Sequence, residues 1–132
     1  MIELLSLVEH GWGGARRCSL ELEGRGVRVE HLIKGRLTPD ELAMIAPRPH
    51  IRLRAVTRWQ YPLWMWAALI ARLGRRPLWL LIDRERTVLA VRGWCRLFKI
   101  LPLVIREDDD GYQLLLDGRT VTLEALLQQA GR

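Results

Sequence analysis

Residues 77–82 place the strongest constraint on the fold of this chain. The segment PLWLLI is apolar at every position, whereas a strand with one face in water alternates apolar and polar residues. A short apolar run is typical of a central parallel strand that is covered on both faces. The sequence therefore predicts a mainly parallel sheet between two layers of helices.

Strand and helix patterns alternate along the rest of the chain. Ile2–Val8 is an apolar run, a helical stretch covers Ala15–Glu23, and Val27–Ile33 alternates at its start as a strand does. A strand, a short helix and a second strand in this order favour parallel pairing. Three further segments show helical patterns, Pro39–Ile45, Pro62–Leu73 and the stretch around Val88, Val91, Cys95 and Phe98. Two more show strand patterns, His50–Val56 and Ile100–Ile105. Pro102 favours an edge position for the last of these strands.

The C-terminal part of the chain predicts a hairpin and a short helix. Asp117-Gly118 separates the strand patterns Tyr112–Leu116 and Arg119–Thr122, and a two-residue Asp-Gly loop suits a type I′ turn. Thr122 can cap a last helix over Leu123–Gln129. Together the patterns predict one domain over residues 1–132, a three-layer Rossmann-like or flavodoxin-like α/β fold with a mainly parallel sheet, a C-terminal β-hairpin and a short helix.

A glycine-rich turn after the first predicted strand is the main candidate ligand site. In an open parallel sheet ligands bind beyond the carboxyl ends of the strands, and glycines there let backbone N–H groups and a helix N-terminus approach a phosphate. Alternatively, the glycines only form a tight turn. Asp83, which follows the central strand, either caps the next helix or contacts a ligand at the same edge. The expected ligand-binding residues are His10, Gly11, Gly13, Gly14, Arg16, Arg17 and Asp83.

The run Leu7–Val29, LVEHGWGGARRCSLELEGRGVRV, resembles the opening of the N-terminal Rossmann-like domain of GT-B glycosyltransferases. In that family a strand leads to a Gly-Gly-Ala helix start and then to an Arg-Gly-x-x-Val entry into the second strand. The resemblance covers about a sixth of the chain and implies that the Gly13-Gly14 turn faces an acceptor or diphosphate cleft. The second domain, with which those enzymes bind most of the sugar nucleotide, lies outside the resemblance. We therefore expect binding of a nucleotide or nucleotide sugar rather than transferase activity from this chain alone.

Basic and tryptophan residues are concentrated in the middle of the chain. Residues 48–106 carry thirteen Lys or Arg against two acidic residues. Trp64 and Trp66 point about 200° apart on a helix, so one should enter the core while the other faces a partner or water. This segment supports a second hypothesis, a non-enzymatic interaction module that contacts a second copy of the chain, an acidic protein or nucleic acid. Nucleic acid is the least favoured partner, because the acidic C-terminal hairpin neutralises part of the positive charge.

Patterns typical of metal centres and nucleophilic catalysts are missing from the sequence. Cys18 and Cys95 have no CxxC partner and lie on the apolar sides of predicted helices. His10, His31 and His50 are not expected to converge, so neither a catalytic residue nor a cofactor is assigned and enzymatic activity stays open. The N-terminus has no signal-peptide pattern, and the uncharged run 59–71 is shorter than the ~20 residues of a membrane span. A cytoplasmic location is expected.

Overall fold

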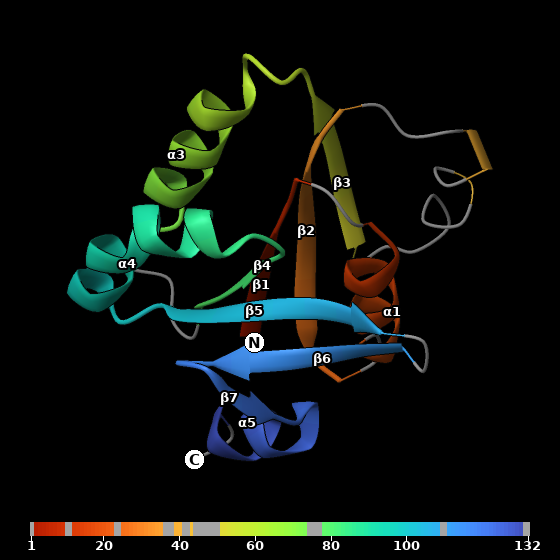
Figure 1. The fold of residues 1–132 in the computed structure, drawn as a ribbon, viewed down its shortest axis with the longest axis vertical. Coiled ribbons are helices and arrows are strands. Elements are labelled where there is room, and N and C mark those ends of the chain that lie inside the picture. The colour runs from red at the N-terminus through yellow and green to blue at the C-terminus, as the bar shows by residue number, and fades with distance from the viewer. Residues whose placement is uncertain are drawn as a thin grey trace.

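A computed structural model describes residues 2–9, 12–22, 25–35, 39–40, 43, 51–73, 78–108 and 111–130. They form three layers, with helices on both faces of a seven-stranded sheet (Figure 1). The strand order is β3-β2-β1-β4-β5-β6-β7, parallel from β3 to β5 and antiparallel from β5 to β7. The predicted fold class is confirmed. The strands are β1 Ile2–Val8, β2 Val27–Lys34, β3 Ile51–Val56, β4 Leu78–Ile82, β5 Leu101–Asp108, β6 Gly111–Leu116 and β7 Arg119–Val121, and the helices are α1 Trp12–Leu22, α3 Tyr61–Ala71, α4 Glu85–Phe98 and α5 Leu123–Ala130.

The central strands β1 and β4 are covered on both faces. One core contains Leu4 of β1 together with Cys18 of α1 and Leu126 of α5. The other contains Leu5 of β1 and residues of α3 and α4 such as Leu69. Every residue of β4 is buried, as its uniformly apolar sequence predicts. Cys18 and Cys95 are both buried as free thiols.

The C-terminal hairpin confirms the prediction from its Asp-Gly loop. Asp117 and Gly118 have φ angles of 53° and 80°, and a type I′ turn needs positive φ at both central positions. The Thr122 hydroxyl accepts a hydrogen bond from the Ala125 backbone N–H at 3.2 Å, so Thr122 caps α5 as predicted.

The prediction that Pro102 places its strand at an edge is wrong. β5 lies between β4 and β6 in the sheet. Pro102 is opposite Leu80 of β4, whereas the pairing with β6 begins at Val104. At Pro102 itself β5 is therefore paired on one side only. The missing N–H of the proline leaves no hydrogen bond of the sheet unmade there, as at an edge strand.

Other element boundaries differ from the predictions by a few residues. α1 begins at Trp12, so Gly13 and Gly14 belong to the first turn of the helix rather than to the turn before it. α4 is continuous through Gly93. The helix predicted over Pro39–Ile45 lies outside the described residues apart from residues 39–40 and 43. None of the helices in the described ranges is both long and apolar enough to cross a bilayer.

The end of α4 provides a test of backbone strain. Lys99 has a left-handed backbone (φ 55°, ψ 44°), and the next N–H, of Ile100, donates to the Cys95 carbonyl at 2.9 Å. A residue with a Cβ atom in this conformation loses ~1 kcal/mol relative to glycine. We predict that Lys99→Gly raises the free energy of unfolding by about 0.5–1 kcal/mol, while Lys99→Ala leaves it unchanged. Urea denaturation followed by circular dichroism checks this, and a less stable glycine variant would contradict it.

The buried histidine provides a test of pH dependence. His31 lies in the middle of β2, opposite Ser6 of β1, and is fully buried. Burial lowers the pKa of its imidazole from 6.5 to about 3. Below pH 6.5 the unfolded chain therefore binds a proton that the folded chain does not. Above this pH the neutral His31 does not lower the free energy of unfolding. As the pH drops from 6.5 toward the folded pKa, His31 lowers that free energy by up to ~1.4 kcal/mol per pH unit.

We predict that His31→Leu removes this contribution from the pH dependence of unfolding. The measurement is urea denaturation of the parent and the variant at several pH values between neutrality and mild acid. The stability difference between the two proteins should shift in favour of the variant as the pH falls. Parallel stability curves across that range would show that His31 does not carry the effect.

Candidate functional site

The strand order places a crevice at the carboxyl ends of β1 and β4. The chain that leaves β1 enters α1 on one face of the sheet, whereas the chain that leaves β4 enters α4 on the other face (Figure 1). A reversal of this kind opens a space between the two connections, and ligands of open α/β sheets bind there. Glu9 is the first residue after β1 and Asp83 is the first residue after β4.

Asp83 joins the ends of the two central strands. The backbone N–H of Glu9 donates to both carboxylate oxygens of Asp83, at 3.0 Å each. The N-cap residue of α4 is Arg84, which makes no side-chain capping bond. Of the two roles expected for Asp83, the helix cap is not the one that its printed contacts show, because its carboxylate accepts hydrogen bonds from the amide at the end of the neighbouring strand.

The side chain of Glu9 in turn connects the end of β1 to the start of α4. The Thr87 hydroxyl, in the first turn of α4, donates a hydrogen bond to Glu9 Oε2. Glu9 Oε1 lies 3.7 Å from Lys34 Nζ and 3.8 Å from Arg84 Nη1. The Glu9 side chain is only 9% exposed, and buried carboxylates in proteins are paired and hydrogen-bonded in this way. Glu9 and Asp83 together hold β1, β4 and α4 in a fixed arrangement.

The first hollow at this edge is lined by cations. It has a volume of about 400 Å³ and is bounded by Glu9, Lys34, Gly35, Arg58 and Arg84. Three of these residues are positively charged: Lys34 is the last residue of β2, and Arg58 and Arg84 lie in the connections that follow β3 and β4. The one carboxylate is already engaged by Lys34, Arg84 and Thr87. The hollow therefore has an excess of positive charge.

The second hollow shares Glu9 and Arg84 with the first and is more apolar. It measures about 250 Å³, and its walls include Tyr61, Pro62 and Met65 of α3 and Ala90 of α4. The Tyr61 hydroxyl is buried and has no hydrogen-bond partner among the described residues. Burial, and then the negative charges of Glu9 and Asp83, raise the pKa of this phenol above its usual value. Tyr61 stays protonated and can donate a hydrogen bond.

The residues predicted from the sequence are only partly brought together here. Asp83 lies at the crevice, whereas His10 and Gly11 lie outside the described residues. Gly13 and Gly14 are in the first turn of α1, and Arg16 is half-buried one turn later. Arg17 is exposed, and its Nη1 lies 4.0 Å from the place that a Cβ at Gly111 would occupy. Arg17 therefore reaches toward the start of β6.

Lys34, Arg58, Tyr61, Arg84 and Thr87 were not among the predicted ligand-binding residues. A usable signal was present, because Lys34 is the last residue of β2 while Arg58 and Arg84 follow closely on the ends of β3 and β4. In a parallel sheet all of these ends lie along one edge. Tyr61 and Thr87 had only a weak signal, since each lies within the first turn of a helix that starts at that edge.

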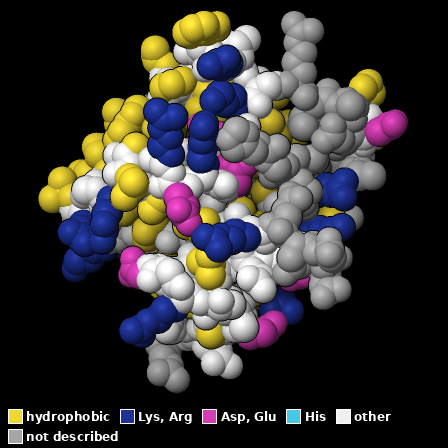
Figure 2. Space-filling model, in the orientation of Figure 1, with side chains coloured by type: hydrophobic (Ala, Val, Ile, Leu, Met, Phe, Trp, Pro, Cys, Tyr) yellow, Lys and Arg dark blue, Asp and Glu magenta, His cyan; other side chains and the backbone are white. Residues whose placement is uncertain are grey.

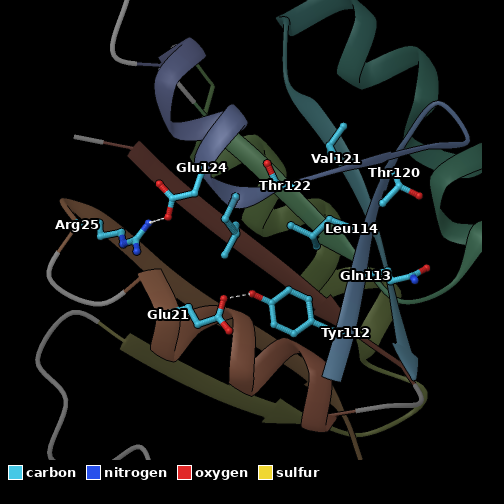
Figure 3. Close-up of a pocket in the computed structure, with 10 residues that line it drawn as sticks. Glu21, Arg25, Tyr112, Gln113, Leu114, Thr120, Val121, Thr122 and Glu124 are labelled. Carbon is cyan, nitrogen blue, oxygen red and sulfur yellow. Dashed lines mark hydrogen bonds and ion pairs between the residues drawn. The ribbon is translucent and has the colours of Figure 1, made fainter. Parts of the chain in front are cut away.

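A third hollow, of about 550 Å³, lies between α1, the β6–β7 hairpin and α5 (Figure 3). Arg25 pairs with Glu124 across it, and the Tyr112 hydroxyl donates to Glu21. It has two carboxylates, of Glu21 and Glu124, against one guanidinium, so it offers no excess of positive charge to an anionic ligand. It is lined by Glu21, Arg25, Tyr112, Gln113, Leu114, Thr120, Val121, Thr122, Leu123 and Glu124.

Comparisons with protein families, with curated proteins and with solved structures find no match to this chain. Within the described ranges, no three His, Cys, Asp or Glu side chains gather closely enough to hold a metal ion. The crevice beyond β1 and β4 is therefore interpreted from its own charges and hydrogen bonds.

The bond between Thr87 and Glu9 can be tested by removing the hydroxyl. Thr87→Val keeps the shape of the side chain but leaves a buried carboxylate without one of its donors. We predict a loss of about 1.5–3 kcal/mol in the free energy of unfolding, the range for hydrogen bonds to charged groups. Thr120→Val, on the exposed surface of β7, is the matched control and should change it by less than about 0.5 kcal/mol. Equal stabilities of the two variants in urea denaturation would contradict the assigned role of Glu9.

Proposed function

We propose that the chain binds a phosphate-bearing ligand, of the nucleotide or nucleotide-sugar class, in the crevice beyond β1 and β4. The observation that carries the proposal is the hollow lined by Lys34, Arg58 and Arg84, whose single carboxylate is already engaged. Arg and Lys side chains from separate connections can surround a phosphate, and arginine can bind it with two parallel hydrogen bonds.

Two helix N-termini reinforce the positive potential of the crevice. α3 and α4 both begin at this edge, at Tyr61 and Glu85, and neither has a side-chain cap. At α4 the uncapped backbone N–H groups and the helix dipole both favour a bound anion. At α3 the dipole contributes, because Pro62 has no N–H and the Tyr61 N–H donates to the Thr57 carbonyl. The charge of Arg84 at the start of α4 opposes the dipole, which is consistent with a negative ligand between them.

The second hollow suits the part of the ligand that carries no phosphate. Tyr61, Pro62 and Met65 offer apolar contacts, while the exposed Arg86 and the Tyr61 hydroxyl can donate hydrogen bonds. A pocket with apolar walls and a few polar groups is typical of sites for organic ligands. The two hollows share Glu9 and Arg84, so one ligand can extend from the cationic hollow into the apolar one. The proposed function is binding; none of these side chains is assigned a catalytic role.

The test is titration of the purified chain with inorganic pyrophosphate and with uridine and adenosine diphosphates, followed by calorimetry. We predict that Arg58→Gln and Lys34→Gln each weaken binding about tenfold or more, because each removes a charge-assisted hydrogen bond to phosphate. Affinity should also fall as salt is raised. Gly13→Asp adds a carboxylate at the start of α1 and should weaken binding if that helix also faces the ligand.

Arg25→Gln is the matched control for these variants. It removes one arginine charge near the third hollow, where Arg25 pairs with Glu124, and should leave the affinity unchanged. The proposal is wrong if none of the three probes binds. It is also wrong if Arg25→Gln weakens binding while Arg58→Gln and Lys34→Gln do not.

A further inference from the structure

The exposed large apolar side chains of the described residues are gathered on one part of the surface. Figure 2 shows hydrophobic side chains over the region that α3 and α4 occupy in Figure 1, with Lys and Arg beside them. Scattered exposed apolar residues are normal on a protein, whereas a contiguous group marks an interaction site. These side chains are Trp59, Leu63, Trp64, Ile70, Leu73, Leu89 and Leu97; together with Arg86, Arg92 and Arg96 they are called the α3–α4 surface below.

The outer side of α3 is apolar where a surface helix is normally polar. Residues 59–71 contain no charged side chain. The buried stripe of α3 is Tyr61, Met65 and Leu69, and at 100° per residue Leu63 and Ile70 project on the opposite side. They are 72% and 54% exposed. An ordinary amphipathic helix of a globular protein would present charged residues there. α3 is therefore apolar both on the side that faces the protein core and on the side that faces outward.

α4 lies beside α3 and adds positive charge to the same surface. The two helices meet through Trp66 and Trp94, whose rings pack edge to face with centroids 5.6 Å apart. The outer side of α4 carries the exposed Leu89 and Leu97 between the exposed Arg86, Arg92 and Arg96. Residues 86–99 include no acidic residue, and Glu85, which precedes them, pairs with Arg106. The apolar side chains are thus bordered by arginines that form no ion pair with the described part of the chain.

Two exposed tryptophans at the edge of this surface are paired with arginines. The Arg54 guanidinium lies 4.3 Å from the centre of the Trp64 ring, and that of Arg58 lies 5.8 Å from the Trp59 ring. Tryptophan combines a large apolar ring with one polar N–H and is enriched where an apolar phase meets water. An arginine that packs on such a ring places its positive charge where the apolar phase meets water.

We propose that the α3–α4 surface docks on the face of a membrane rich in anionic lipids. The apolar side chains of α3 and α4 would enter the boundary between headgroups and acyl chains, and the arginines would contact the lipid phosphates. Charge complementarity selects this occupant. In a twofold dimer the same surface meets itself, so the arginines of one copy would approach those of the other with no carboxylate from residues 59–71 or 86–99 between them. The proposal does not depend on the phosphate-bearing ligand proposed above.

The experiment is co-sedimentation of the chain with vesicles of phosphatidylcholine alone and with vesicles of phosphatidylcholine and phosphatidylglycerol. We predict binding to the anionic vesicles that weakens as salt rises, and little binding to the neutral vesicles. Arg92→Gln with Arg96→Gln should weaken binding roughly thirtyfold, because each surface arginine contributes ~1 kcal/mol on an anionic bilayer. Leu63→Glu with Ile70→Glu should weaken it about a hundredfold or more, since it removes two apolar contacts and adds two repelled charges.

Gln128→Glu with Gln129→Glu is the control for the second variant. It adds the same charge on exposed positions of α5, away from α3 and α4 (Figure 1), and should keep most of the binding. Circular dichroism checks that all variants are folded. Absence of binding to anionic vesicles overturns the proposal, and so does an equal loss in the α5 control. A dimer without lipid, dissociated by Leu63→Glu with Ile70→Glu in sedimentation analysis, overturns it in favour of a second copy.

Discussion

The burial of β1 and β4 on both faces is the constraint on which the rest of the structure depends. Leu5, Leu7 and Leu80 have no exposed surface, and strands packed in this way have little room for charged groups along their length. Charged chemistry is therefore displaced to the strand ends, where Glu9 and Asp83 are the first residues beyond the sheet. The hydrogen bonds that these two carboxylates accept hold the ends of β1 and β4 and the start of α4 together, and the ion pairs of Glu9 with Lys34 and Arg84 place those cations around the crevice.

Much of the fold could be predicted because several segments carry a local signal with one physical interpretation. The uniformly apolar PLWLLI requires cover on both faces, and Asp117-Gly118 supplies the positive φ angles of a type I′ turn. Pro102 was misleading because a missing N–H shows that one side of a residue is unpaired without showing that its whole strand is at an edge. The start of α1 was misplaced because glycines disfavour a helix in isolation, while the tertiary structure accommodates them in its first turn.

The candidate site was less predictable, because it depends on contacts between distant parts of the chain. The local sequence around Asp83 is compatible with a helix cap, and only the neighbouring end of β1 explains why its carboxylate faces Glu9. Lys34, Arg58 and Arg84 lie at strand ends in the sequence, but their convergence follows from the order of the strands. The sequence shows which strand ends carry charged side chains, whereas the strand order is needed to know which of these side chains lie together.

The pairing of β1 with β4 has a consequence for the way this chain folds. Glu9 and Asp83 are 74 positions apart in the sequence, whereas β1 and β2 are joined through the single helix α1. Contacts between distant segments form slowly, because the chain loses conformational entropy on closing the loop before the contacts stabilise it. The β1 edge of the β1–α1–β2 unit therefore stays unpaired until β4 pairs with it. The crevice forms only with that pairing, so only a chain in which β1 and β4 are already neighbours carries the grouped charges of Glu9, Lys34 and Arg84.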